Sequence, residues 1–384
     1  MTGSDAARLA RAYLSAVAEP PAPALAAYVE AVGPVEAAAR IRRGEVPDPV
    51  AKETLARRER DRAAGHLRVA EAVGARLLTP EDEDWPVQPL LAFARSGCNH
   101  LPAPVALWVR GPGRLAELTD RSVAIVGSRA STGYGNHVAN SLGFGVAELG
   151  CTVVSGAAYG IDGAAHRGAL AAEGPTVAVL ACGVDRSYPA GHARLLAHIA
   201  RDGLVVSEYP PGAVPARHRF LVRNRIIAGL AAGTVVVEAG WRSGARRTAS
   251  DASLLGRPVM AVPGPVTSAL SVGCHRLLRE PGTVAVTTAE EVLEEVGRIG
   301  VDLAPVVPPV IPIRATDGLP STVLRVHEAL CDRTIRDMSR LSVESGLPLE
   351  MVRAALPQLV RTGLVERVDG GWRRSAHPAR RGGA

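Results

Sequence analysis

The chain has 384 residues, of which 47% are hydrophobic and 21% charged, so it can bury a sizeable core divided among two or three domains. Its formal net charge is +6, and nearly all the positive charge is arginine, since Lys52 is the only lysine. Arginine suits phosphate groups. A high-GC genome also replaces lysine with arginine, so charge alone leaves nucleic-acid binding open. Aromatic residues make up only 3%, which argues against a surface paved with stacking rings.

Neither a disulfide framework nor a structural zinc site is expected, because the number of cysteines is odd and none forms a Cys-x-x-Cys pair. The five cysteines are Cys98, Cys151, Cys182, Cys274 and Cys331. Residues 1–17 contain Arg8 and Arg11 and lack the apolar stretch of a signal peptide. Since no uncharged apolar run reaches about 18 residues, we expect no membrane span and a cytoplasmic protein.

Residues 1–83 are expected to form a helical domain. Ala6–Ala18, Leu25–Val32 and Val35–Arg43 are helical in composition, and Gly33-Pro34 separates the last two. Two helices joined by a Val-Gly-Pro turn are the outline of a SAM-like or helix-hairpin-helix unit, whose turn can present backbone N–H groups to phosphate. The alternative is a plain helical cap on the next domain.

Residues 84–297 are expected to form an α/β core with an extended Rossmann-like fold, which is a doubly wound, mostly parallel sheet. A lead-in strand falls within residues 102–111, and short β-branched runs then alternate with helical segments in a βαβ series. The expected strands are Val123–Val126, Cys151–Val154, Thr176–Leu180, Leu204–Val206, Thr234–Val237 and Pro258–Val262. The expected helices are Tyr134–Leu149, Ile161–Ala172, Ala193–Arg201, Arg223–Ala231 and Ala249–Leu255.

The C-terminal part is expected to hold a Pro-rich linker over residues 298–320 and a winged-helix-like domain over 321–377. Three helical segments precede a hairpin in this domain. They are Ser321–Leu330, Asp337–Ser345 and Leu349–Thr362, and the hairpin strands are Leu364–Val368 and Trp372–Arg374. Pro357 lies inside the third helix and is expected to kink or shorten it, which weakens its assignment as a DNA-reading helix.

The segments that follow the strands are rich in glycine, serine and arginine. In an open parallel sheet these segments meet beyond the carboxyl ends of the strands, where ligands bind. Glycines let the backbone approach a ligand, and free N–H groups attract anions. The pattern therefore predicts a phosphate-binding groove. The residues expected to line this groove are Gly127, Ser128, Arg129, Ser155, Gly156, Gly160, Arg219, Phe220, Arg223, Asn224, Arg225, Ser243, Gly244, Arg246 and Thr248.

Individual roles within the groove are also predicted. Arg129 and Arg223 are expected to bind phosphate, whereas Arg225 is expected to be a structural partner of Glu238. Asp162 is expected to cap its helix. A second structural group is His166, close to the start of that helix. No catalytic residue, metal site or cofactor is predicted, and the spacing of His192, His198 and His275 does not indicate metal ligands.

Two classes of enzyme are alternative interpretations of this groove. A nicotinamide-dependent oxidoreductase needs Gly-x-Gly-x-x-Gly after the first strand and an acid after the second, but here the second strand ends in Ser155-Gly156. A nucleotide phosphoribohydrolase of the lysine-decarboxylase-like group needs Pro-Gly-Gly-x-Gly-Thr-x-x-Glu. Only Gly233-Thr234 and Glu238 match it. This second enzyme is kept as the alternative function.

Several motifs together resemble the DNA-processing protein A family, also called DprA or Smf. The most specific is Arg223-Asn224-Arg225-Ile226-Ile227-Ala228-Gly229-Leu230. The others include Gly127-Ser128-Arg129, Ser155-Gly156 with Gly160-Ile161-Asp162, Ser207-Glu208-Tyr209 and Ser243-Gly244 with Thr248-Ala249. The resemblance covers about residues 85–293.

The resemblance implies a non-catalytic homodimer that binds single-stranded DNA and helps to load the RecA recombinase during natural transformation or recombination. The sequence departs from the family pattern at four positions on the expected rim of the groove. These are Leu221 in place of a proline, Ala245 in place of a small polar residue, and Cys274-His275 in place of Ser-Asn.

Overall fold

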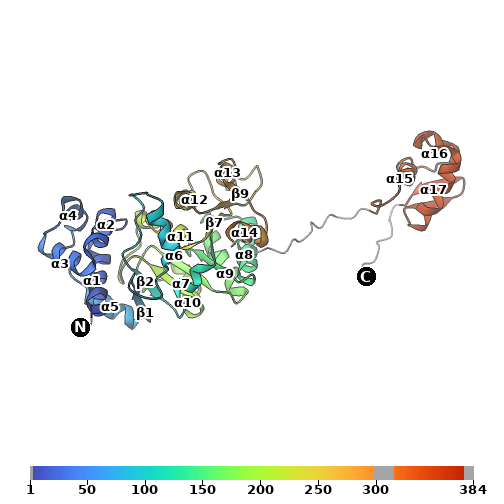
Figure 1. Cartoon of the computed structure of the whole chain (residues 1–384). Helices are drawn as coiled ribbons and strands as arrows, with labels where there is room; N and C mark the ends of the chain where they lie inside the picture. Colours follow the sequence, from blue (N-terminus) through green and yellow to red (C-terminus); the bar gives the residue numbers. More distant parts are fainter. Residues whose placement is uncertain (1–2, 298–314, 376–384) are drawn as a thin grey trace. The chain divides into compact units, whose positions relative to one another are not determined.

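The protein is described by a computed structural model that covers residues 3–297 and 315–375. The chain divides into two compact units, Met1–Pro305 and Val306–Ala384. Figure 1 shows the helices and strands of each unit. None of the helices among the described residues is both long and apolar enough to cross a bilayer.

The first unit is built on a nine-stranded sheet with the order β1-β2-β6-β5-β4-β3-β7-β8-β9. β3 to β9 run parallel, whereas β1 and β2 are antiparallel at one edge. The strands are β1 (Ala75–Leu78), β2 (Leu107–Arg110), β3 (Ser122–Val126), β4 (Thr152–Ser155), β5 (Thr176–Leu180), β6 (Leu204–Ser207), β7 (Gly233–Val236), β8 (Val259–Ala261) and β9 (Thr283–Ala285). The chain adds strands outward from β3 to β6, then returns to place β7 on the other side of β3. The switch point of this doubly wound sheet therefore lies between β3 and β7.

Helices cover both faces of this sheet. One face packs on α6 (Val87–Arg95), α7 (Leu115–Asp120), α11 (Arg217–Leu230), α12 (Ala245–Leu254) and α13 (Val272–Leu277). The other packs on α8 (Gly133–Glu148), α9 (Ile161–Ala171), α10 (Ala193–Asp202) and α14 (Ala289–Val296). Val177 and Val179 of β5 point to the first face, and Ala178 and Leu180 point to the second. This alternation explains why the central strands are continuous apolar runs.

The predicted α/β fold is confirmed, with differences in detail. The six predicted core strands and five helices are all present. β1, β9 and several short helices were not predicted, and α11 begins at Arg217 rather than at Arg223. The first turns of α11 contain Arg217, His218 and Arg219, which carry no apolar periodicity. The earlier start places Phe220 on the helix.

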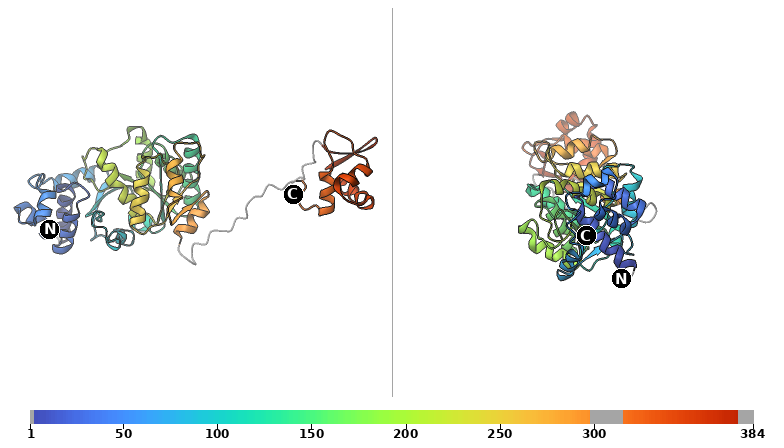
Figure 2. Two further views of the ribbon diagram at one scale, coloured as in Figure 1. Left: turned by 90° about the horizontal axis from the view of Figure 1, so that it is seen from above. Right: turned by 90° about the vertical axis from the view of Figure 1, so that its left-hand side faces the viewer.

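The five N-terminal helices lie at the β1 end of the sheet (Figures 1 and 2). They are α1 (Gly3–Val17), α2 (Pro23–Val32), α3 (Pro34–Arg43), α4 (Asp48–Thr54) and α5 (Ala63–Ala72). Tyr13, Leu14 and Ile41 of these helices belong to the same buried cluster as Leu180 and Val184 of the core. A shared core holds the helices in a defined position against the sheet. The division at residue 83 stays a prediction.

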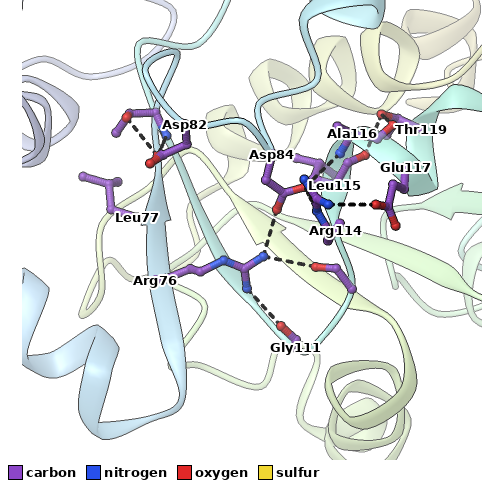
Figure 3. Close-up of polar contacts among 12 residues, drawn as sticks. Arg76, Leu77, Asp82, Asp84, Gly111, Arg114, Leu115, Ala116, Glu117 and Thr119 are labelled. Atoms are coloured by element: carbon purple, nitrogen blue, oxygen red, sulfur yellow. Dashed lines mark hydrogen bonds and ion pairs between the residues drawn. The ribbon is translucent and has the colours of Figure 1, made fainter. Parts of the chain in front are cut away.

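A polar network fixes the lead-in segment between β1 and α7 (Figure 3). The Arg76 guanidinium donates to the Gly111 carbonyl at 3.0 Å, to the Gly113 carbonyl at 3.1 Å and to Asp84 at 2.9 Å. The other oxygen of Asp84 accepts from the backbone N–H of Ala116, in the first turn of α7. These contacts join the antiparallel edge to the start of the parallel core.

The second unit is a small helical domain with a two-stranded ribbon. Its helices are α15 (Ser321–Glu328), α16 (Met338–Ser345) and α17 (Leu349–Arg361), and β10 (Val365–Val368) pairs with β11 (Gly371–Arg374). α17 runs through Pro357 to Arg361, so the proline does not shorten it. Most of the predicted linker, residues 298–314, lies outside the described residues. The winged-helix assignment stays a prediction.

Candidate nucleic-acid interface

The loops that follow β3, β4 and β7 interlock at the switch point. The backbone N–H of Ser128 donates to the Glu238 carbonyl at 2.7 Å, and that of Ile161 donates to the Ser128 carbonyl at 3.2 Å. Gly160 has a positive φ of 77°, and a Cβ there would lie 2.2 Å from the Ser128 oxygen. A Cβ on Gly127 would lie 2.5 Å from Ile161. The two glycines are therefore needed for close packing between loops.

Arg223 lies beneath these loops instead of on their surface. Its side chain is buried, and Nη1 donates to the Val179 carbonyl at 3.0 Å. Burial lowers the pKa of the Arg223 guanidinium to about 10, although the nearby Asp162 opposes this shift. A Cβ on Gly156 would lie 1.6 Å from Nη1, so the glycine makes room for the guanidinium. This burial contradicts the prediction that Arg223 contacts phosphate directly.

Asp162 and His166 are both buried structural groups. α9 begins after Gly160 with no side-chain cap, and Asp162 accepts instead from the backbone N–H of Gly156 at 3.2 Å. The predicted capping role is therefore wrong, although Asp162 does hold the β4 loop. Burial raises the pKa of Asp162 and lowers that of His166 to about 3. His166 Nδ1 lies 2.7 Å from the Thr176 hydroxyl, which itself donates to the Val153 carbonyl.

The predicted pairing of Arg225 with Glu238 is wrong. Arg225 Nη2 donates to both carboxylate oxygens of Glu208, at 2.6 and 2.8 Å, and both residues are buried. Glu238 accepts from the backbone N–H and the hydroxyl of Thr132, at 2.9 and 2.6 Å. Arg225 is thus held in a buried ion pair whose partner comes from the end of β6, which does not support its place among the expected groove-lining residues. Glu238 holds the β3 loop.

An exposed stack of cationic and aromatic side chains stands above these buried groups. The Arg129 guanidinium lies over the Phe220 ring at 4.5 Å, and the Tyr188 ring lies 5.5 Å from that of Phe220. Arg129 is exposed, and Tyr188 is 40% exposed. The stack brings together the loops after β3 and β5 and the start of α11. Such a surface offers both a positive charge and ring faces.

Two more arginines near the stack were not among the predicted site residues. Arg217 at the start of α11 and Arg186 two residues before Tyr188 are both exposed. Arg219, which was predicted, instead pairs with Glu19 through both carboxylate oxygens, at 2.7 and 3.0 Å. Because Arg219 already has a carboxylate partner, it is less available to phosphate. Arg186 lies in one of the segments that follow the strands, so the sequence pattern did include it. Arg217 was missed because α11 was predicted to begin only at Arg223.

Aromatic faces are more concentrated at this edge than the overall composition indicated. Tyr134, Tyr159 and Trp241 also follow strands at the carboxyl edge of the sheet and are 41%, 49% and 59% exposed. The Arg276 guanidinium lies 4.7 Å from the centre of the Trp241 ring. Aromatic residues are few in the whole chain, but several exposed rings therefore lie at the carboxyl edge of the sheet.

The remaining predicted residues support the edge from the side of β7 and β4. The Asn224 amide donates to the Gly244 carbonyl at 3.2 Å. The Ser243 hydroxyl accepts from the backbone N–H of Ala245, and Arg246 Nη1 donates to the Trp241 carbonyl. Thr248 is buried. Ser155 is buried too, and its hydroxyl donates to the Ile125 carbonyl at 2.6 Å.

The four departures from the family pattern differ in how exposed their side chains are. Ala245 and Cys274 are buried, and burial raises the pKa of the Cys274 thiol to about 12. His275 is half-buried, with Nε2 lying 2.9 Å from the Gly264 carbonyl. Leu221 is 55% exposed near the stack. Of the four, Leu221 is the most accessible to a ligand.

A metal centre finds no support in this part of the molecule. Over residues 3–297 and 315–375, no group of three or more His, Cys, Asp or Glu side chains is arranged to hold an ion. The arrangement of exposed arginines and aromatic rings is suited to phosphates and bases.

Comparison of the chain with known protein families identifies the family to which it belongs. Residues 76–297, which span the sheet and most of its helices, match the family described as DNA recombination-mediator protein A. The chain belongs to this family. The match includes the stack of Arg129, Tyr188 and Phe220 and the buried residues below it. The N-terminal helices and the second unit lie outside the matched range.

Individual proteins are similar to this chain as well. The chain is 52% identical over 374 residues to a putative DNA processing protein DprA of Mycobacterium tuberculosis, covering 96% of this chain and 95% of that protein. The solved structure of DprA from Streptococcus pneumoniae is similar with a TM-score of 0.62 and 32% identity, covering 76% of this chain and 98% of that one. That of Helicobacter pylori, reported for its single-stranded DNA binding mode, has a TM-score of 0.49 and 25% identity, covering 57% and 94%.

Proposed function

We propose that this member of the recombination-mediator family binds single-stranded DNA at the carboxyl edge of its sheet. The observation that carries the proposal is the stack of exposed Arg129 and Tyr188 against half-buried Phe220, with exposed Arg186 and Arg217 nearby in the chain. Arginines bind phosphate oxygens through charge-assisted hydrogen bonds. Unstacked bases lie on aromatic rings whatever their sequence, because every base has a π face. The edge therefore fits a strand without a sequence preference.

Single strands are favoured over a duplex by the same arrangement. The bases of a duplex are stacked on one another, so their faces are not accessible to Phe220 or Tyr188. A duplex would use only the arginines, whereas a single strand would use the rings as well. The direct phosphate ligands that we propose are Arg129, Arg217 and Arg186. Arg223 contributes a buried positive charge and the shape of the loop after β4.

The wider role proposed for the chain is that of its family, mediation of DNA recombination. In this role the bound strand is passed to the RecA recombinase, the chain acts as a homodimer, and the cytoplasm is its place of action. The second unit is proposed to be auxiliary. Its deletion should leave most of the affinity for single strands in place.

We propose further that the chain acts without catalysis. Burial under the loops lowers the pKa of His166 to about 3 and raises that of Asp162, so both of these titratable groups near the switch point are buried in the protein interior. A phosphoribohydrolase would need an acid or base in contact with its nucleotide. Nucleotide monophosphate turnover without DNA binding would favour that alternative.

The test is the affinity of Arg129→Ala for fluorescent oligothymidylate, measured by anisotropy. A charge-assisted contact contributes about 1.5–3 kcal/mol, so affinity should fall about tenfold to a hundredfold. The melting temperature should stay near that of the wild type because Arg129 is exposed. Arg95→Ala is the control, since Arg95 is exposed on α6 beside Asp120 and Leu230, at the opposite edge of the sheet. Unchanged affinity in Arg129→Ala would contradict the proposed site.

A further inference from the structure

The N-terminal helices place two arginines beside the proposed interface. Arg62, immediately before α5, and Arg68, inside α5, line a hollow of about 660 Å³ together with Pro211. Pro211 belongs to the loop between β6 and α11, so one wall of the hollow comes from the sheet's carboxyl edge. The family match begins only at residue 76, so these helices lie outside it.

The loop with Pro211 connects the hollow to the aromatic stack. The next residue, Gly212, accepts from Arg186 Nε at 3.3 Å and donates its N–H to Asp185 at 2.9 Å. Burial lowers the pKa of His66, on α5, and the nearby Asp185 opposes this shift. Two residues beyond Arg186, the Tyr188 ring packs on Phe220. The loop with Pro211 thus links Arg186, two residues before Tyr188 of the stack, to the hollow beside the N-terminal helices.

Arg62 and Arg68 are exposed, and neither forms an ion pair among the residues that the structure describes. Other basic side chains nearby are already neutralised. Arg42 pairs with Asp61 at 2.8 Å, and Arg57 pairs with Glu19 at 2.6 Å. Asp61, the acid that lines the hollow, therefore has a cation of its own. The charge left over in the hollow is positive.

The hollow is held in place relative to the interface by two features. The buried cluster that joins Tyr13 and Leu14 to Val184 spans the N-terminal helices and the loop after β5. Glu19 adds polar contacts across the same boundary, because it binds Arg57 on one side and His218 and Arg219 on the other. The segment that carries Arg62 and Arg68 is therefore packed beside the loop with Pro211.

We infer that the N-terminal helices extend the single-strand track, with Arg62 and Arg68 binding backbone phosphates of a strand that has already crossed Arg129 and Phe220. This inference rests on the proposed function. The occupant is the sugar-phosphate backbone of the same strand, because the hollow offers unpaired cations and lines up with the stack through Arg186. Contacts of this kind carry no sequence information.

The test compares strand lengths. Affinities of the full chain for oligothymidylates of about 4 to 16 nucleotides, the lengths that single protein folds accommodate, are measured for the wild type and for Arg62→Gln/Arg68→Gln. The shortest strands that bind should be held equally well by both. On longer strands the variant should lose about tenfold in affinity. The slope of log affinity against log salt should become shallower by about 1.4, which is 0.7 for each of two phosphates.

The control removes the same charge elsewhere. Arg95 and Arg279 are exposed at the opposite edge of the sheet, where Arg95 lies beside Asp120, just before β3, and Arg279 lies just before β9. Arg95→Gln/Arg279→Gln should behave as the wild type at every length. Equal losses in both double variants, or no length dependence in Arg62→Gln/Arg68→Gln, would overturn the inference while leaving the proposed function intact. Failure of the wild type to bind short strands would instead overturn the proposed function. A change in self-association of the variant without a change in long-strand affinity would assign the hollow to a protein contact.

Discussion

The ion pair between Arg225 and Glu208 permits a quantitative test of how the interface is supported. Only 2% of the Arg225 side chain and 8% of the Glu208 side chain are exposed, and the nearest nitrogen and oxygen are 2.6 Å apart. The Arg225 guanidinium also lies 5.9 Å from the centre of the Phe93 ring. We therefore consider Arg225→Met, which keeps most of the volume of the side chain and removes its charge.

The loss of stability follows from leaving one charge buried alone. Breaking a buried ion pair by removing one partner costs about 3–5 kcal/mol. For domains of about 150–250 residues each kcal/mol lowers the melting temperature by about 2–4 °C, so Arg225→Met should melt about 6–20 °C lower than the wild type. Removing both charges, in Arg225→Met/Glu208→Leu, should recover most of this loss because no unpaired carboxylate remains.

Urea denaturation and thermal melting of the two variants and of Glu208→Leu complete a double-mutant cycle. Affinity for short oligothymidylate, measured well below the melting temperature, should change less in Arg225→Met than in Arg129→Ala. A loss below about 1 kcal/mol in Arg225→Met, or a double variant as unstable as the sum of the single ones, would refute the argument from burial.

Two further changes test the neighbourhood of this pair. Burial opposes ionisation of Glu19, but hydrogen bonds from Arg219, Arg57 and His218 outweigh it and lower the pKa of Glu19 to about 2. The stability that Glu19 contributes is therefore present above pH 4.5 and lost as pH falls through 2. The difference in unfolding free energy between the wild type and Glu19→Gln, about 1 kcal/mol after allowing for solvent screening, should disappear over that range in urea titrations. Gly156→Ala should lower the free energy of unfolding by about 1–3 kcal/mol, since its Cβ would lie 2.4 Å from Arg223 Cζ. Wild-type stability in that variant would show that Arg223 moves freely.

The sheet was predictable because its central strands are buried on both faces. Thr176–Leu180 is a run of β-branched and apolar residues, and it forms β5 with the predicted bounds. β1 was not predictable in the same way, since Arg76 interrupts its apolar residues and its pairing with β2 depends on a segment about thirty residues away. Edge strands depend more on their partner than on their own pattern.

For the proposed site, the sequence indicated which segments meet at the edge of the sheet but not how deep each side chain lies. Glycines at the strand ends indicated where the backbone comes close to other groups, and Gly127 and Gly160 do lie in tight contacts between loops. The depth of each arginine was not readable from spacing. Arg223 and Arg225 are both buried, because α11 begins at Arg217 and turns this part of the helix toward the sheet.

The sequence by itself determined the order of the central strands and their helices, the position of the proposed binding edge and the family, because local periodicity and short motifs indicate each of these. Only the tertiary structure decided that Arg225 pairs with Glu208, and that Arg129 is exposed and lies over the Phe220 ring. It also decided that the N-terminal helices reach the loop with Pro211. The physical reason is that a side chain's partner and exposure depend on which helix face meets which strand end. That is set by the packing of segments distant in the chain.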